Sequence, residues 1–232
     1  MSKRIVPLAI IILGLLAWGC ESPEEATEGT QVTTPNIKLE PYYFSFDTGD
    51  AVSEIHDVTF KREPGTYIVA LNAAANISAV VKPSGDFNTT VYSYTDTAKF
   101  DGAEYIIGDN WMDVSTYNPT DHSISNNGTF YFVRATGYQI VKFMVDSASP
   151  SVFNIKYAVS ADGGSTFPTA TEQAVSYAEE SPVDFDFNQG TGITPAEWHI
   201  GLITSPVAGS PYPMQNVIIN YKNDTKVAVI SD

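Results

Sequence analysis

Three consecutive runs of apolar, β-branched and aromatic residues occupy the middle of this 232-residue chain. They cover residues 129–135, 138–145 and 152–159, and segments rich in Gly, Asp, Ser and Pro separate them. Strand-length runs with turn residues at this spacing are typical of antiparallel strands that follow one another in a sheet. The sequence therefore predicts a three-stranded β-meander, with turns at Thr136-Gly137 and at residues 146–150.

The middle run alternates as a strand does. Successive side chains of a strand point to opposite faces, so every second residue shares a face. One face carries a lysine among its apolar residues and the other is wholly apolar, which predicts a sheet with one face wetter than the other. The first face holds Ile140, Lys142 and Met144, and the second holds Val141, Phe143 and Val145.

The chain before the meander shows further strand patterns and no pattern of a long helix. Residues 58–62 and 67–72 flank Pro64-Gly65, which predicts a hairpin. Residues 91–99 alternate as an edge strand would, and residues 105–107 form a shorter apolar run. We therefore predict an all-β fold, an antiparallel sandwich or meander with few or no helices.

Residues 1–19 have the pattern of a bacterial lipoprotein signal peptide. Lys3 and Arg4 precede an apolar run too short for a comfortable transmembrane span, and a small residue precedes Cys20. We therefore expect lipidation of Cys20 and anchoring to the outer membrane at the cell surface; plain secretion with an unpaired thiol is the alternative. Residues 20–40 are acidic and rich in Thr and Pro, which predicts a flexible tether.

Charge and motif content argue against several classes of function. A formal net charge of −15 argues against nucleic acid and anionic lipid as partners. Cys20 is the only cysteine, so we expect no disulfide within the chain and no thiolate metal site. The sequence carries no nucleophile-elbow, zinc-protease or phosphate-loop motif. We therefore expect a protein that is not an enzyme.

The C-terminal part of the chain resembles the beginning of the folded region. Trp198 occupies the place of His56, and Asn220 occupies the place of Asn72. The separation between matched positions grows slowly along the chain, as short insertions in a repeat would make it. Shared β composition is the alternative explanation.

These features predict the organisation of the folded region. We expect a β domain at residues 41–167, a linker at residues 168–182 and a partial β repeat at residues 183–232. The second unit has no counterpart of the meander. It therefore either packs its strands on the first domain or forms a truncated module.

Several short motifs follow one another between residues 42 and 167: YFSF at 43–46, HDVTFKR at 56–62, NW at 110–111, FYFVRATG at 130–137, VKF at 141–143 and FNIKY at 153–157. These ordered motifs resemble those of the HmuY family of haem-binding surface lipoproteins. The resemblance implies an all-β fold, haem or porphyrin as ligand, and delivery to an outer-membrane transporter.

The resemblance also locates a candidate haem site. One histidine of the family's pair falls at Thr116, and the other falls within residues 99–109, which contain no histidine. Haem iron takes axial ligands such as His, Met or Tyr, so Tyr117, His122 and Met112 are the nearest substitutes. His122 in a solvated turn, without a ligand role, is the alternative reading.

Two other kinds of surface function fit the sequence. A surface adhesion or matrix module would keep the fold without binding haem. A polysaccharide-binding protein would display aromatic side chains on one exposed sheet face.

Overall fold

The computed structural model describes residues 31–37, 41–112, 116–178, 181–205, 214–220 and 225–226. The chain divides into two compact units, residues 1–34 and 35–232, and every element described below belongs to the second unit. The expected signal peptide and Cys20 lie outside the described residues, as does most of the expected tether. No helix within the described residues is long and apolar enough to cross a membrane.

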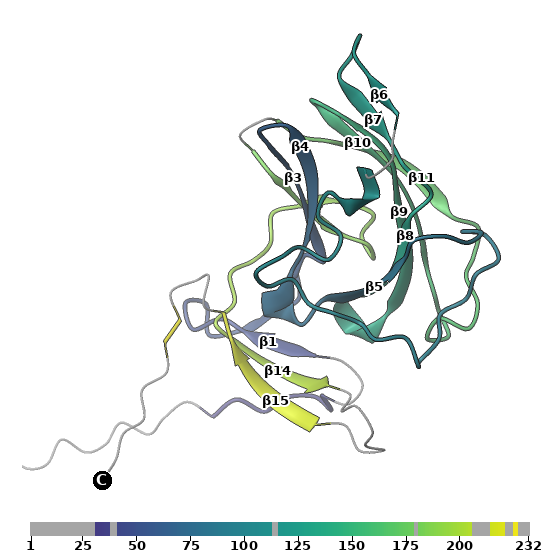
Figure 1. Ribbon diagram of the computed structural model, residues 1–232. Helices are drawn as coiled ribbons and strands as arrows, with labels where there is room; N and C mark the ends of the chain where they lie inside the picture. The colour runs from purple at the N-terminus through teal and green to yellow at the C-terminus, as the bar shows by residue number, and fades with distance from the viewer. Residues whose placement is uncertain are drawn as a thin grey trace, which may run out of the picture. The chain divides into compact units, whose positions relative to one another are not determined.

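The second unit is all-β and antiparallel, as the sequence predicts, and its helical segments are single 3₁₀ turns (Figure 1). The described residues form three sheets, called here sheet A (β15-β14-β1-β2), sheet B (β13-β12-β3-β4) and sheet C. Sheet C runs β11-β10-β9-β7-β6, and β8 pairs with both β9 and β5. Sheets A and B contain β1 (Tyr42–Phe44), β2 (Ala51–Val52), β3 (Val58–Glu63), β4 (Thr66–Leu71), β12 (Val183–Asp186), β13 (Thr191–Ile193), β14 (Ile200–Ser205) and β15 (Met214–Ile219). Sheet C contains β5 (Ser78–Lys82), β6 (Tyr117–Asn118), β7 (Ser123–Ser125), β8 (Phe130–Arg134), β9 (Ile140–Ser149), β10 (Val152–Val159) and β11 (Thr171–Ser176).

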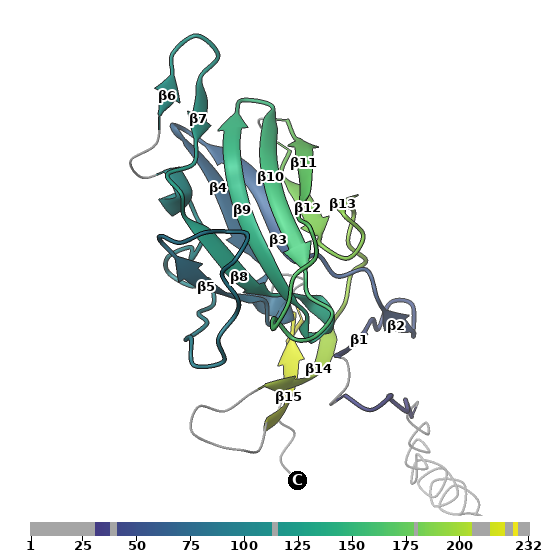
Figure 2. The same cartoon turned by 90° about the vertical axis from the view of Figure 1, so that its right-hand side faces the viewer.

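The predicted meander is present as β8, β9 and β10, which lie side by side in sheet C (Figure 2). Its first turn contains Gly137, whose positive φ of 71° suits glycine. The second turn is shorter than predicted, because β9 continues through residues 146–149. Ser147 and Ala148 keep strand geometry because they pair with β10 on one side and with β7 on the other. A register shift between Asn154 and Ile155 accommodates the longer strand.

The main core lies where aromatic side chains of sheets B and C meet. Phe60 of β3 has its ring centre 5.0 Å from that of Phe153 and 6.3 Å from that of Phe143, both in sheet C. Phe185 of β12 stands edge-on to the Phe60 ring at 5.7 Å. All four side chains are completely buried. The predicted apolar face of β9 therefore forms the centre of the core.

The other face of β9 is wetter, as predicted, because Met144 and Asp146 on it are half-buried, whereas Val141, Phe143 and Val145 are buried. Its lysine is nevertheless covered. Lys142 is only 2% exposed. Ile140 belongs to a second apolar cluster on this face, and Met144 packs against that cluster. Phe87, from the segment after β5, and Phe167, from the segment after β10, help to cover the face. The alternation predicted for β9 is present. The two segments that cover this face have no regular sequence pattern that would predict their position.

The segment after β5 differs from the prediction in a second respect. Residues 91–99 do not form an edge strand; they make turns and a single bridge, between Lys99 and Ala79. Within this segment the Asp96 backbone N–H donates to the Ser93 carbonyl at 3.0 Å. Local bonds of this kind compete with a strand ladder.

Residues 105–107 are not a strand either. The Asp101 carboxylate accepts the backbone N–H of Ile106 at 2.7 Å and that of Leu71 at 2.6 Å. It therefore holds residues 101–106 as a loop beside the end of β4.

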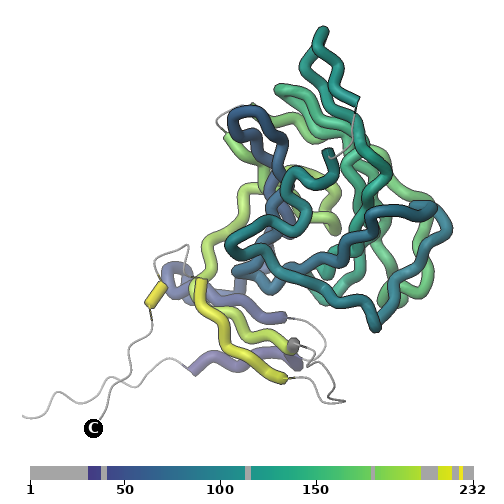
Figure 3. The backbone as a smooth tube through the Cα atoms, viewed as in Figure 1, coloured from purple at the N-terminus to yellow at the C-terminus, as the bar shows by residue number. Residues whose placement is uncertain are grey.

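Strands from residues 183–219 complete sheets that begin near the N-terminal end of the unit. β12 pairs with β3, with Phe185 opposite Val58, and β14 pairs with β1, with Ile200 opposite Phe44. Figure 3 shows the second of these pairings, with the purple trace of β1 beside the yellow-green trace of β14. The segment expected to be a linker contains β11, which pairs with β10 along its whole length. The two parts of the chain therefore share their sheets.

Matched positions of the two parts make matched contacts. The side-chain amide of Asn72 donates to the His56 carbonyl at 3.0 Å, and its backbone N–H donates to the Asp57 carbonyl at 3.0 Å. Asn220 makes the same two contacts, both at 3.0 Å. Its partners are Trp198 and His199. The predicted correspondence of Asn72 and Asn220 therefore extends to their hydrogen bonds.

Candidate functional site

Tyr117 and His122 face each other across the short hairpin of β6 and β7. The Tyr117 phenol oxygen lies 2.5 Å from Nδ1 of His122. Tyr117 is 52% exposed, so solvent or a ligand reaches the phenol. The hairpin is tied to sheet B, because the Tyr67 hydroxyl of β4 donates to the His122 carbonyl at 2.9 Å. The structure thus brings together two of the three residues expected near haem iron.

The backbone of the hairpin turn fixes the histidine. His122 has a positive φ of 56°, a conformation uncommon for residues other than glycine. The preceding Asp121 carboxylate accepts the backbone N–H of Ser123 at 3.0 Å. Hydrogen bonds from the side chain and the backbone of Ser123 lower the pKa of Asp121. This turn holds the imidazole against the Tyr117 phenol and leaves the phenol at the surface.

Met112, the third expected residue, has a different environment. It ends the 3₁₀ turn Asn110–Met112 and packs, partly buried, against the main core. The neighbouring Trp111 is completely buried and donates from its indole nitrogen to the Tyr67 carbonyl at 3.2 Å. Residues 113–115, which connect this turn to Tyr117, lie outside the described residues. Met112 therefore serves the core in this structure.

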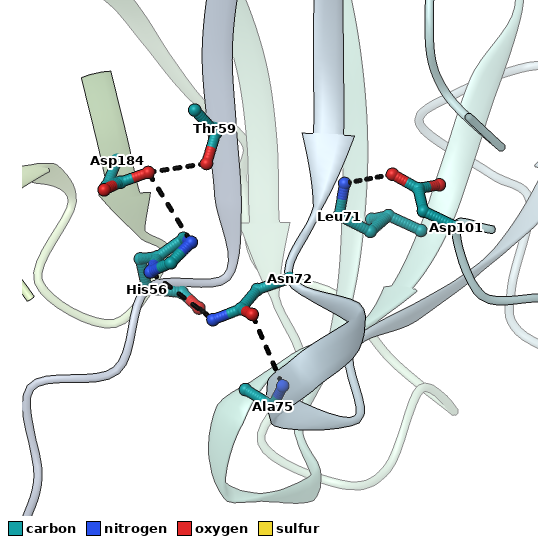
Figure 4. A network of polar contacts seen from close by, with 7 residues as sticks. All are labelled: His56, Thr59, Leu71, Asn72, Ala75, Asp101 and Asp184. Atoms are coloured by element: carbon teal, nitrogen blue, oxygen red, sulfur yellow. Dashed lines mark hydrogen bonds and ion pairs between the residues drawn. The ribbon is translucent and has the colours of Figure 1, made fainter. Parts of the chain in front are cut away.

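His56 lies in a structural network where β3, β4 and β12 meet (Figure 4). Its Nε2 is 3.5 Å from Oδ1 of Asp184, the same oxygen that accepts the Thr59 hydroxyl at 2.5 Å. Its Nδ1 is 3.4 Å from the side-chain nitrogen of Asn72. Both ring nitrogens of His56 are therefore engaged within the fold.

His199 is placed in a similar way in the second part of the chain. Its Nδ1 accepts the backbone N–H of Phe46 at 3.1 Å, and its Nε2 is 3.7 Å from Asp47. Within the described residues no group of three or more His, Cys, Asp or Glu side chains is arranged to hold a metal ion.

The structure also contains a pocket that the sequence interpretation missed. It has a volume of about 350 Å³ and lies on the outer face of sheet C, away from Tyr117 and His122. Lys142 of β9 and Lys156 of β10 both line it. The alternation of β9 placed Lys142 on this face, but only the register, with Lys156 opposite Met144, brings the second lysine to the same face.

Comparison of the chain with protein-family models, with curated proteins and with solved structures finds no match.

Proposed function

We propose that this chain is a non-enzymatic surface lipoprotein of the HmuY type, anchored to the outer membrane by lipid on Cys20. In this proposal it captures ferric haem through Tyr117 and passes it to an outer-membrane transporter. The observation that carries the proposal is the 2.5 Å contact between the half-exposed Tyr117 phenol and Nδ1 of His122. The all-β antiparallel fold is consistent with the resemblance.

The chemistry of the pair suits ferric iron. A phenolate oxygen is an established axial ligand of haem iron, but a phenol must first lose its proton. In the tautomer that carries its hydrogen on Nε2, neutral His122 accepts a hydrogen bond from the phenol at Nδ1. Tyr117 would hold ferric haem iron through its phenolate oxygen, and Nδ1 of His122 would accept the phenol proton.

A surface adhesion or matrix module is the second candidate, and one observation favours it. Every residue from 116 to 122 is exposed, so these residues do not enclose a flat ring between them. A protruding, solvent-covered hairpin is also the kind of surface that another protein contacts. This candidate predicts that no iron ligation occurs at Tyr117.

Titration of the full chain with ferric haem tests the proposal. We would purify the chain in a non-ionic detergent and follow the visible spectrum for a phenolate-to-iron charge-transfer band, with haem in the same micelles without protein as the blank. We expect a saturable one-to-one complex showing this band. Tyr117→Phe should abolish the band, and His122→Ala should weaken binding because the proton acceptor is lost.

Tyr94→Phe is the matched control, because Tyr94 is 76% exposed and lies in a different segment. It should leave the titration unchanged. Saturable binding without the charge-transfer band, or equal binding by Tyr117→Phe, would reject Tyr117 as the ligand. No binding by the unmodified chain would reject the haem proposal and favour the adhesion module.

A further inference from the structure

The pocket on the outer face of sheet C has a buried base and a polar rim. Lys142 and Phe87, which are both buried, lie at its base, and the half-buried Phe167 forms part of its wall. Thr169 and Glu172, both exposed, lie at its rim. Its volume of about 350 Å³ is at the small end of the range of about 300–1,000 Å³ typical of small-molecule sites.

Lys142 brings a positive charge to the base of this pocket. Its Nζ donates to the Phe87 carbonyl at 2.8 Å and lies 4.4 Å from the centre of the Phe167 ring. No carboxylate of the described residues lies within ion-pair distance of it. Burial lowers the pKa of Lys142, while the more distant Asp86 carboxylate acts in the opposite direction. An ammonium group buried in this way gains from an anion that supplies the missing acceptor.

A second ammonium group lies on the same aromatic ring. Lys156 Nζ is 5.3 Å from the centre of the Phe87 ring, and Lys142 Nζ is 5.4 Å from it. Lys156 also lies 3.7 Å from Glu172, whose side chain is 74% exposed. Two lysines against one glutamate leave one net positive charge among the residues that line the pocket.

We propose that this pocket binds the carboxylate of a sugar acid, a single polyhydroxylated ring of the uronate class. The one net positive charge matches a monoanion better than a phosphate dianion. The carboxylate would lie between Lys142 and Lys156, and the apolar face of the ring would pack on Phe87 and Phe167. Hydroxyl groups at the outer edge of the ring would donate to Glu172 and exchange hydrogen bonds with Thr169.

The local charge of the pocket contrasts with that of the whole protein. The chain has a net charge of −15, so its surface field repels anions in general. An acidic sugar therefore binds only where lysines are concentrated and water is partly excluded. The proposal does not depend on haem binding, because it involves none of the residues of the β6–β7 hairpin.

Calorimetric titration of the full chain in detergent tests this site, with sodium glucuronate as the probe. Glucose and inorganic phosphate are the comparison ligands. We expect saturable one-to-one binding of glucuronate and at least tenfold weaker binding of the other two. Lys156→Met should weaken glucuronate binding at least tenfold, and so should Lys142→Met if that variant folds.

Lys61→Met is the matched control, because Lys61 pairs with Glu63 on β3 and lies outside the pocket. It should bind glucuronate as the unmodified chain does, and so should Tyr117→Phe, whatever its effect on haem. Absence of saturable glucuronate binding, or equal loss in Lys61→Met and Lys156→Met, would overturn the proposal and leave Lys142 with a structural role. Equal affinity for glucose would overturn the role of the carboxylate, and equal affinity for phosphate would overturn the sugar-acid class.

Discussion

The carboxylate of Asp57 accepts two hydrogen bonds from Thr136, one from the backbone nitrogen at 2.7 Å and one from the hydroxyl at 2.8 Å. Its other oxygen accepts the backbone N–H of Phe187 at 2.9 Å. Asp57 is completely buried, and the three donors come from segments far away in the sequence. One side chain thus joins the start of β3, the turn before β9 and the end of β12.

Replacing Asp57 by alanine should therefore destabilise the protein strongly. The change leaves one buried donor, the Phe187 N–H, and two part-buried donors of Thr136 without an acceptor. A buried unpaired donor costs about 1–3 kcal/mol, and a part-buried one costs less. We expect the free energy of unfolding to fall by about 3 kcal/mol or more, measured by urea denaturation. Asp47→Ala is the control, because the Asp47 side chain is 70% exposed. A loss no larger than that of the control would show that the Asp57 contacts contribute little.

The same carboxylate should make stability depend on pH. Burial raises the pKa of Asp57 to about 6, although the hydrogen bonds from Thr136 and Phe187 act to lower it. The folded protein therefore holds this proton more tightly than the unfolded chain, whose aspartates titrate near pH 3.9. The resulting stabilisation is complete below about pH 4 and is lost as the pH rises through about 6, a change of up to about 3 kcal/mol.

Urea denaturation between about pH 4 and pH 7 measures this dependence, with Asp57→Asn as the comparison, because asparagine does not titrate. The difference in unfolding free energy between the two proteins should shrink towards the higher pH. Subtraction also cancels the exposed Asp162, whose pKa is lowered to about 2 by hydrogen bonds from Thr166 and Ser160. Parallel curves for the two proteins would contradict a raised pKa at Asp57.

The strands of the meander could be predicted from sequence because their pattern is local. Phe143 and Lys142 point to opposite faces of β9 as alternation requires, and β10 begins and ends where its apolar run does. No local sequence pattern predicts which distant segments pair with each other. β11 falls in a stretch that reads as a linker, yet it pairs with β10 because that edge of sheet C is open to it.

The two candidate sites also differ in how far a local sequence pattern can predict them. Tyr117 and His122 lie five residues apart on one hairpin, so a local count could bring them together. Lys156 meets Lys142 only through the register of β9 and β10, and Phe87 and Phe167 reach them from irregular segments. Lysine is rarely fully buried, so the sequence predicts that Lys142 lies on the wetter face. In the structure the Phe87 carbonyl and the Phe167 ring cover the Lys142 ammonium group.

Tyr138 should specifically stabilise sheet A. Its hydroxyl accepts the backbone N–H of Thr204 at 2.7 Å and donates to the Ile37 carbonyl at 3.2 Å. Tyr138→Phe removes both hydrogen bonds and keeps the ring, so we expect a loss of about 1–2 kcal/mol. Hydrogen exchange should also become faster at the Thr204 amide and stay unchanged in β9. Tyr94→Phe, which removes one bond from an exposed tyrosine to Gly163, should cost less.

Gly164 should tolerate a side chain poorly, because it lies against Tyr92 in the second apolar cluster. A Cβ atom there would lie 2.6 Å from Cβ of Tyr92, and the residue has a φ of +95°. Gly164→Ala must therefore displace Tyr92, which is buried in the second apolar cluster.

Gly137→Ala is the matched control, since its φ is also positive, at 71°, but no atom lies within 4 Å of the added carbon. We expect Gly137→Ala to cost about 1 kcal/mol through backbone strain alone and Gly164→Ala to cost about 1–3 kcal/mol more, by urea denaturation. Equal losses in the two variants would mean that Tyr92 moves freely and that the second apolar cluster is not closely packed.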